Sequence, residues 1–202
     1  MIAAVVLAAG ESTRMGTQKL LLPYAAATVI EHIISQLSAS RVDQVVVVTG
    51  FEPHRIKEHL TGGAYTFAQN DRYREGMLSS IRCGLALLGE AVEAAFVVLG
   101  DQPALQSATV DTILAQQPGN SDRVILPTHE GRRGHPILVP LTFREEIMRR
   151  FDDTGLRGLI HAHPDAILEV PVTSASILED IDYPKDYVRA LKALEESRGT
   201  KT

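Results

Sequence analysis

The sequence predicts an α/β protein built around a doubly wound, mostly parallel sheet. Three observations predict this class: short apolar runs rich in β-branched residues, segments whose apolar residues have a helical period, and the alternation of the two. The runs at 2–8, 45–48 and 96–99 are continuously apolar, which is typical of strands buried on both faces of a parallel sheet. Short loops between the runs favour a single sheet with connecting helices packed against it.

The helices are predicted from the segments between these strands. In 29–37 the apolar residues fall on one helical face, and Thr28 is the expected N-cap. The same period returns after Ser79 or Ser80, and Pro184 suits the first turn of a last helix. The expected order is strand 2–8, a glycine loop, a helix from 28, strand 44–49, helix 53–60, strand 64–68, helix 79–88, strand 94–99, helix 107–116, strand 123–127, strand 135–139, helices 141–151 and 156–161, strand 167–172 and a helix from 184.

Length and composition favour one folded unit. The 202 residues are 45% apolar, so we expect a single domain over 1–195 followed by a flexible tail over 196–202. The net charge of −5 argues against a chain-wide basic surface for nucleic acid, and the one cysteine, Cys83, excludes a disulfide framework within the chain. The apolar start lacks the basic segment of a signal peptide, and no apolar run approaches the roughly 20 residues that span a bilayer. The cytoplasm is the expected compartment, without a membrane partner.

A glycine loop follows the first strand, at the sheet edge where ligands bind in doubly wound folds. Gly10 and Gly16 permit positive φ, and successive backbone N–H groups can form a nest for an anion. Arg14 and Lys19 add two positive charges, which together with these donors suits a triphosphate. The spacing matches neither a Walker A loop nor the dinucleotide G-x-G-x-x-G pattern. An ordinary βα turn with solvated charges is the alternative.

Two carboxylates are candidates for a metal site. Asp101 follows a buried strand at the same sheet edge, where one aspartate with phosphate oxygens and water suits a hard cation such as Mg²⁺. Its alternative role is to cap the helix near Ser107 or to tighten a turn. Asp182 is the second candidate and shares one side with Asp180 if the segment is extended. Its alternative role is the N-cap of the last helix.

The loop Leu7-Ala8-Ala9-Gly10-Glu11-Ser12-Thr13-Arg14-Met15-Gly16, followed by Lys19-Leu20-Leu21, resembles the signature of the MobA-like nucleotidyltransferases. More narrowly, it is similar to the branch of molybdenum cofactor cytidylyltransferases. The likeness continues, in the same order, in Gly76-Met77 with Ser79-Ser80, in Gly100-Asp101-Gln102-Pro103, in Arg133-Gly134-His135-Pro136, in Asp153-Thr154-Gly155-Leu156-Arg157 and in Asp180-Ile181-Asp182-Tyr183-Pro184. These blocks cover nearly the whole chain, and Tyr183 departs from the threonine usual in the last one.

The resemblance implies a Rossmann-like three-layer α/β/α sandwich and an enzyme that transfers a nucleoside monophosphate with Mg²⁺ and release of pyrophosphate. For the cytidylyl branch, CMP passes from CTP to the terminal phosphate of the molybdopterin cofactor. The pair Ala9-Gly10 stands where the guanylyl branch usually has two glycines, and the extra methyl narrows the pocket for a purine, which favours CTP. The implied partners are CTP, a phosphorylated pterin acceptor and a molybdenum hydroxylase.

The resemblance also assigns site residues. Arg14 and Lys19 hold the β and γ phosphates and, with Asp101, form the catalytic set; Asp101 binds the metal, and Asp182 binds it directly or through water. The residues expected to bind the nucleotide or acceptor are Leu7, Ala8, Ala9, Gly10, Gly16, Ser80 and His135. No general base is required, because a phosphate acceptor with a second pKa of about 6 is already largely ionised.

Several of these assignments leave alternatives open. Ser80 lies close to the base or ribose in the family, yet its hydroxyl also suits a helix N-cap. His135 faces the acceptor in the family, and a structural role is its alternative. Arg132 and Arg133 either meet an anionic acceptor or face water, and the acceptor role of Asp153 and Arg157 depends on the likeness alone. The pair His161 and His163 resembles a metal chelate, but Pro164 favours a loop at the end of a helix.

Two other functions remain open. One is a guanylyltransferase, or another NTP transferase, acting on a different phosphorylated acceptor. The other is an accessory protein that binds the cofactor of a molybdoenzyme without catalysis. The intact set of Arg14, Lys19 and Asp101 favours an enzyme.

Overall fold

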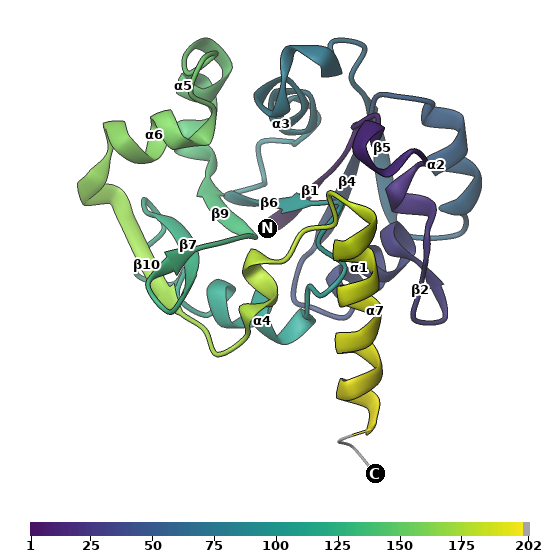
Figure 1. Ribbon diagram of the computed structural model, residues 1–202. Coiled ribbons are helices and arrows are strands. Elements are labelled where there is room, and N and C mark those ends of the chain that lie inside the picture. The colour runs from purple at the N-terminus through teal and green to yellow at the C-terminus, as the bar shows by residue number, and fades with distance from the viewer. Residues whose placement is uncertain (200–202) are drawn as a thin grey trace.

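A central sheet runs through the protein in the computed structural model, which describes residues 1–199 (Figure 1). Its eight strands follow the order β10-β7-β9-β6-β1-β4-β5, with β8 paired to β7 outside this path. The strands are β1 (Ile2–Ala8), β4 (Gln44–Thr49), β5 (Tyr65–Gln69), β6 (Ala94–Leu99), β7 (Val124–His129), β8 (Arg132–Arg133), β9 (Ile137–Pro140) and β10 (Ile167–Pro171).

The central strands are parallel. β1 pairs with β4 on one side and β6 on the other, so that Val5 lies opposite both Val46 and Val97. The pairs β4–β5 and β7–β10 are parallel as well. Two strands are exceptions: β9 lies antiparallel to both β6 and β7, and the short β8 lies antiparallel to β7. The predicted mostly parallel, doubly wound sheet is confirmed, with β9 as an antiparallel strand inside it.

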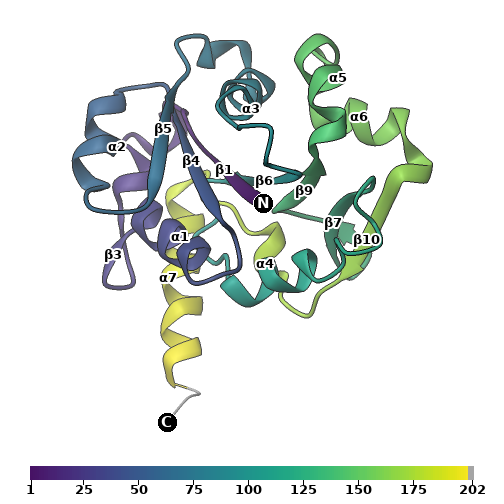
Figure 2. The ribbon, with the colours of Figure 1, turned by 180° about the vertical axis from the view of Figure 1, so that it is seen from behind.

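Helices cover both faces of the sheet and bury two separate cores (Figures 1 and 2). One face carries α1 (Val29–Ser38), α2 (Pro53–His59), α4 (Ser107–Leu114) and α7 (Pro184–Gly199), and the other carries α3 (Met77–Ala86), α5 (Arg144–Arg149) and α6 (Leu156–Ala162). Successive residues of β1 alternate between the cores: Ala4 and Val6 face the first, Ala3 and Val5 the second. The predicted three-layer α/β/α sandwich is therefore confirmed.

Local hydrogen bonds explain where helices begin. Thr28 caps α1 as expected, in a capping box in which its hydroxyl accepts from the Glu31 N–H and the Glu31 carboxylate accepts from the Thr28 N–H. The helix expected from 79 begins two residues earlier, at Met77. Its N-cap is Gly76, whose φ of 105° is a conformation that favours glycine. Ser79 therefore lies inside the first turn instead of capping it.

Short irregular elements complete the chain. A two-stranded hairpin, β2 (Pro23–Tyr24) and β3 (Ala27–Thr28), precedes α1 and was not expected from the sequence. The helix expected over 141–151 is a 3₁₀ turn, η4 (Leu141–Phe143), followed by the shorter α5. The remaining 3₁₀ turns are η1 (Thr13–Met15), η2 (Lys19–Leu21), η3 (Tyr73–Glu75), η5 (Pro164–Ala166) and η6 (Ala175–Leu178).

The last helix extends into the expected tail. α7 continues to Gly199, so that the part of the 196–202 segment up to Gly199 is helical, whereas 200–202 lies outside the described residues. Among the described residues, no helix combines the length and the apolar character needed to cross a membrane.

Candidate functional site

A cavity opens at the carboxyl ends of β1 and β6, where doubly wound sheets bind ligands. Its volume is about 340 Å³, within the range of small-molecule sites. The glycine loop, the start of α3, the end of β6 and the segment before α7 all contribute to its wall. The lining residues are Leu7, Ala9, Gly10, Ser12, Thr13, Arg14, Lys19, Leu20, Tyr73, Gly76, Met77, Ser80, Leu99, Gly100, Asp101 and Asp182.

The glycine loop is held in a tight curve around the 3₁₀ turn η1. Ser12 and Gly16 flank this turn with φ of 55° and 67°, both in the left-handed region. The Ser12 hydroxyl donates to Gln18 Oε1 at 2.9 Å and accepts from the Lys19 backbone N–H at 3.2 Å. This serine thereby closes the loop and positions Lys19 at the start of η2, a role that the sequence analysis did not assign.

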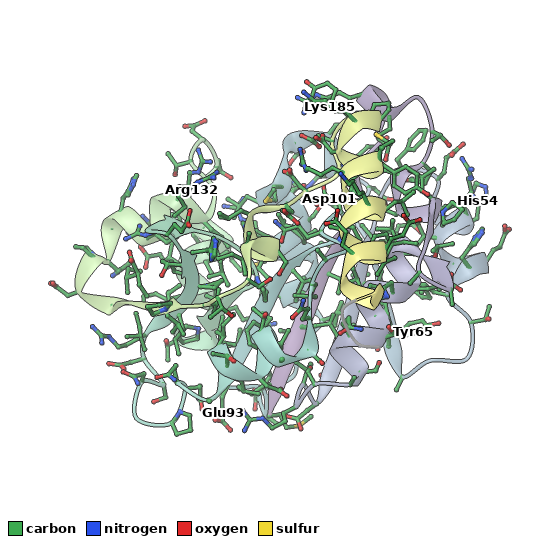
Figure 3. The ribbon with its side chains drawn as sticks, turned by 60° about the horizontal axis from the view of Figure 1, so that its bottom comes forward. His54, Tyr65, Glu93, Asp101, Arg132 and Lys185 are labelled. Carbon is green, nitrogen blue, oxygen red and sulfur yellow. The ribbon has the colours of Figure 1, made fainter. Side chains whose placement is uncertain are left out.

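Lys19 joins two carboxylates from distant parts of the chain. Its Nζ lies 2.6 Å from Asp101 Oδ2 and 3.0 Å from Asp182 Oδ1. Arg14 Nη1 lies 2.9 Å from the other oxygen of Asp182. Asp101, labelled in Figure 3, follows β6, whereas Asp182 lies two residues before α7. The two basic and two acidic residues singled out from the sequence thus form one charge cluster on the cavity wall.

The contacts at the starts of α4 and α7 bear on the alternative capping roles of the two aspartates. The Asp101 carboxylate bonds Lys19 and makes no capping bond to α4, whose N-cap is Gln106. At the start of α7, the backbone N–H groups of Asp182 and Tyr183 donate to the Asp186 carboxylate. Asp182 therefore turns its own carboxylate toward the cavity, where Lys19 and Arg14 bind it.

Asp182 is brought to the cavity by a crossing segment, 175–182, that is pinned at two places. The Ile177 carbonyl accepts from the His135 N–H at 3.0 Å and from Gln102 Nε2 at 3.4 Å. Four residues on, the Ile181 N–H donates to the Asp101 carbonyl at 2.9 Å. These bonds attach the crossing segment to the loops after β6 and before β9, and so fix the position of Asp182 relative to Asp101.

The electrostatics of the cluster favour a bound cation. Burial lowers the pKa of Lys19, but the charges and hydrogen bonds of Asp101 and Asp182 outweigh it and leave that pKa above its ordinary value. Burial and the negative charges of the same two aspartates raise the pKa of Asp180. Three carboxylates therefore crowd one region, and the half-buried ammonium of Lys19 contacts two of them.

The donor set suits a hard divalent cation. Asp101 and Asp182 offer carboxylate oxygens to one position, since both already contact the same ammonium. Within the described residues, no group of three or more His, Cys, Asp or Glu side chains could enclose a metal by itself. A cation here would complete its shell with oxygens of a ligand or of water, as Mg²⁺ does with phosphates.

The structure separates the residues expected to bind ligand into two groups. Leu7, Ala9, Gly10 and Ser80 line the cavity. Ala8 points into the core with 1% of its surface exposed, and Gly16 ends η1. Neither residue is among those that line the cavity.

His135 lies at a second cavity of about 320 Å³. Burial lowers the pKa of His135 to about 4, partly offset by the charge of Asp101, so that the imidazole is neutral at pH 7. Arg133, Arg157 and His161 also line this cavity, and Arg133 pairs with Glu169 at 2.6 Å. Arg132, labelled in Figure 3, is exposed.

Asp153 and His163 line neither of these two cavities. Asp153 is exposed, and the N-cap of α6 is Gly155. His163 Nε2 lies 2.8 Å from Glu146 Oε2, so that it contacts a carboxylate on α5 and forms no chelate with His161.

A latch between the glycine loop and η3 was not predicted. The Tyr73 hydroxyl and Arg74 Nε both donate to Glu11 Oε1, at 3.0 and 2.8 Å, and thereby tie the glycine loop to η3. The bonds from Arg74 and Tyr73 hold the pKa of Glu11 below its ordinary value. Gly50 permits this approach, because a Cβ there would lie 2.7 Å from the Cβ of Tyr73. The only signal in the sequence was the place of Glu11 inside the glycine loop.

Comparison with known proteins shows the family of the chain. The family model of the MobA-like NTP transferase domain matches residues 4–167. The chain is 30% identical over 192 residues to the molybdenum cofactor cytidylyltransferase of Escherichia coli (strain K12), covering 94% of this chain and 95% of that protein. It is 27% identical over 197 residues to the nicotine blue oxidoreductase of Paenarthrobacter nicotinovorans, covering 94% and 96%.

Solved structures extend the likeness to the fold. The crystal structure of Rv0371c from Mycobacterium tuberculosis H37Rv has a TM-score of 0.84 at 27% identity, covering 95% of this chain and 97% of that one. The same protein in complex with manganese has a TM-score of 0.78 over the same shares of both chains. Sequence, fold and the charged cavity agree: the chain belongs to the MobA-like NTP transferase family and is a nucleotidyltransferase.

Proposed function

We propose that this protein is an Mg²⁺-dependent cytidylyltransferase that transfers CMP from CTP to the terminal phosphate of the molybdopterin cofactor and releases pyrophosphate. The observation that carries the proposal is the cluster in which Lys19 joins Asp101 and Asp182, beside Arg14, on the wall of a cavity built from the glycine loop. The cytoplasm is the proposed compartment, and a molybdenum hydroxylase is the proposed recipient of the product.

Each part of the cluster has a chemical role in this reaction. Arg14, Lys19 and the N–H groups of the glycine loop bind the β and γ phosphates, whose charge develops further as pyrophosphate leaves. Asp101 and Asp182 would hold the metal, which would supply positive charge to neutralise phosphate oxygens. The acceptor phosphate is ionised near pH 7, so that the chain needs no general base.

The wall of the cavity supports CTP, and the second cavity supports an anionic acceptor. Ala9 lines the nucleotide cavity, where its methyl takes space that a glycine would leave to a larger base. Arg133 and Arg157 line the second cavity beside the neutral His135 and place positive charge there for an acceptor phosphate. The E. coli relative, named a molybdenum cofactor cytidylyltransferase, supports the choice of both substrates.

Pyrophosphate release tests the proposal directly. The purified protein is given CTP, GTP, ATP or UTP with Mg²⁺, each with and without molybdopterin cofactor. Release that requires both CTP and the cofactor supports the proposal. Preference for GTP or for another phosphorylated acceptor identifies the alternative transferases, and no release with any pair favours a non-catalytic accessory protein.

Variants connect the activity to the cluster. Asp101→Ala should lower turnover by several orders of magnitude and Lys19→Ala should lower turnover and weaken triphosphate binding, because each removes a charged contact to metal or phosphate. Asp122→Ala, on an exposed surface, is the matched control and should retain full turnover. Wild-type turnover in Asp101→Ala would exclude the metal assignment.

A further inference from the structure

A buried amide beside the nucleotide cavity fixes the direction of a hydrogen bond. Asn70 follows β5, has 6% of its surface exposed, and accepts the Arg72 backbone N–H through Oδ1 at 3.0 Å. A backbone N–H can only donate, so that this bond determines which end of the amide is oxygen. The nitrogen end, Nδ2, then donates to Ser79 Oγ at 2.8 Å and to Ser80 Oγ at 3.0 Å.

The two serines that share this amide use their own protons differently. The Ser79 hydroxyl lies 2.8 Å from the Gly76 carbonyl and 3.0 Å from the Arg72 carbonyl, so that its proton has an acceptor within the protein. The Ser80 hydroxyl accepts from Asn70 and has no acceptor for its proton among the described residues. Ser80 is 4% exposed and lines the nucleotide cavity, whereas Ser79 is not part of the lining.

We infer that Asn70 is a positioning residue: its bond to Ser80 Oγ directs the Ser80 proton away from Asn70, so that the hydroxyl donates to an acceptor atom of the nucleotide base. A cytosine ring offers such acceptors in its carbonyl oxygen and its unprotonated ring nitrogen. A buried donor left without a partner costs free energy, so that a base which satisfies it gains affinity. The inference depends on the proposed function, because it assumes that a nucleoside triphosphate occupies this cavity.

Replacing the Asn70 amide by a carboxylate reverses the direction of its hydrogen bond with Ser80. In Asn70→Asp one oxygen still accepts the Arg72 N–H, but the other can only accept from Ser80, whose proton then turns away from the cavity. The lone pair presented to the base would oppose the acceptor atom there. A ribose hydroxyl in the same place would tolerate the reversal, because it both donates and accepts. This variant therefore distinguishes a base from a sugar as the partner of Ser80.

The test measures binding of CTP and of inorganic tripolyphosphate to the full chain by calorimetry with Mg²⁺. Ser80→Ala should weaken CTP about tenfold, and Asn70→Asp at least as much, since a lost neutral hydrogen bond has about this effect. Both should bind tripolyphosphate like the wild type. In Ser80→Ala/Asn70→Asp, the second change should add nothing to the first, because Asn70 acts through Ser80. Ser79→Ala is the matched control and should bind CTP normally.

Several outcomes would overturn the inference. Normal CTP binding by a folded Asn70→Asp protein, together with weak binding by Ser80→Ala, would assign Ser80 to the ribose. Equal weakening of CTP and tripolyphosphate by Asn70→Asp would make Asn70 merely structural. If Asn70→Asp does not fold, the test is CTP binding by Ser80→Ala. Normal CTP binding by that variant refutes the contact between Ser80 and the base. Wild-type protein that binds tripolyphosphate as tightly as CTP refutes this inference only, whereas binding of neither refutes the proposed function.

Discussion

Replacing Lys19 with methionine preserves most of the length of the side chain and removes its charge. Two carboxylates then remain close together without the ammonium that lies 2.6 Å from Asp101 and 3.0 Å from Asp182. Because the pKa of Lys19 is raised above its ordinary 10.5, the group is charged in both the folded and the unfolded protein at neutral pH. Its contribution to stability is complete below pH 10.5 and is lost only as the pH rises through the higher pKa of the folded state.

The loss of folding free energy expected in Lys19→Met follows from how deeply Lys19, Asp101 and Asp182 are buried. The side chains of Lys19, Asp101 and Asp182 are 14%, 23% and 36% exposed. Breaking a fully buried ion pair costs about 3–5 kcal/mol, and an exposed pair contributes about 0–1 kcal/mol. With partial burial, we expect Lys19→Met to lose about 2 kcal/mol, which lowers the unfolding temperature of a protein of this size by about 4–8 °C.

The assay is thermal unfolding followed by circular dichroism at pH 7, first with a chelator and then with Mg²⁺. The unpaired carboxylates should bind the divalent cation more tightly in Lys19→Met than in the wild type, where the ammonium competes for the same oxygens. Mg²⁺ should therefore raise the unfolding temperature of the variant more than that of the wild type, and narrow the difference between them.

A matched control uses an exposed lysine. Lys192 lies on α7, is 77% exposed and is 3.8 Å from Glu196, so that Lys192→Met should change the unfolding temperature little in either condition. If Lys19→Met unfolds at the wild-type temperature in chelator, the charge cluster does not stabilise the fold. If Mg²⁺ shifts both proteins equally, Asp101 and Asp182 do not form a shared cation site.

Two further predictions concern the crossing segment and the second cavity. His135 has its pKa lowered to about 4 from 6.5, so that the unfolded chain takes up a proton first as the pH falls and stability should drop by roughly 2–3 kcal/mol between pH 6.5 and 4. Urea unfolding at pH 7 and pH 4.5 measures this drop, and His135→Gln should reduce it; an unchanged drop would assign it to other groups. Gly134→Ala would place a Cβ 2.3 Å from the Ile177 carbonyl oxygen and should destabilise the protein by about 1–3 kcal/mol, measured by thermal unfolding. Gly89→Ala, which meets nothing within 4 Å, is its control, and equal unfolding temperatures for the two variants would contradict the clash.

Much of the fold could be predicted because a strand buried on both faces of a sheet is continuously apolar in the sequence. Continuous apolar runs predicted β1, β4 and β6, and Thr28 as an N-cap marked the start of α1. The antiparallel direction of β9 could not be predicted, because an apolar run has the same composition whichever way its strand is oriented. The start of α3 was placed two residues late, because the serines suggested a cap that Gly76 provides with its positive φ.

The candidate site also has parts that the sequence could predict and parts that it could not. Parallel strands end at one edge of a sheet, so that the glycine loop after β1 and Asp101 after β6 could be assigned to one region from their places in the sequence. The latch from Tyr73 to Glu11 gave no such signal, because its partners are 62 residues apart and neither stands in a periodic pattern.

By itself, then, the sequence determined the α/β class, the order of most elements and the loop that faces the ligand edge, because local hydrophobic period and turn chemistry encode them. Only the tertiary structure decided that Asp182 meets Lys19, across 163 residues of chain. The bonds to Ile177 and Ile181 make that meeting possible, and the direction of the Asn70 amide depends on Arg72 and the start of α3. Such contacts depend on how separate segments pack, and no local pattern of residues specifies that packing.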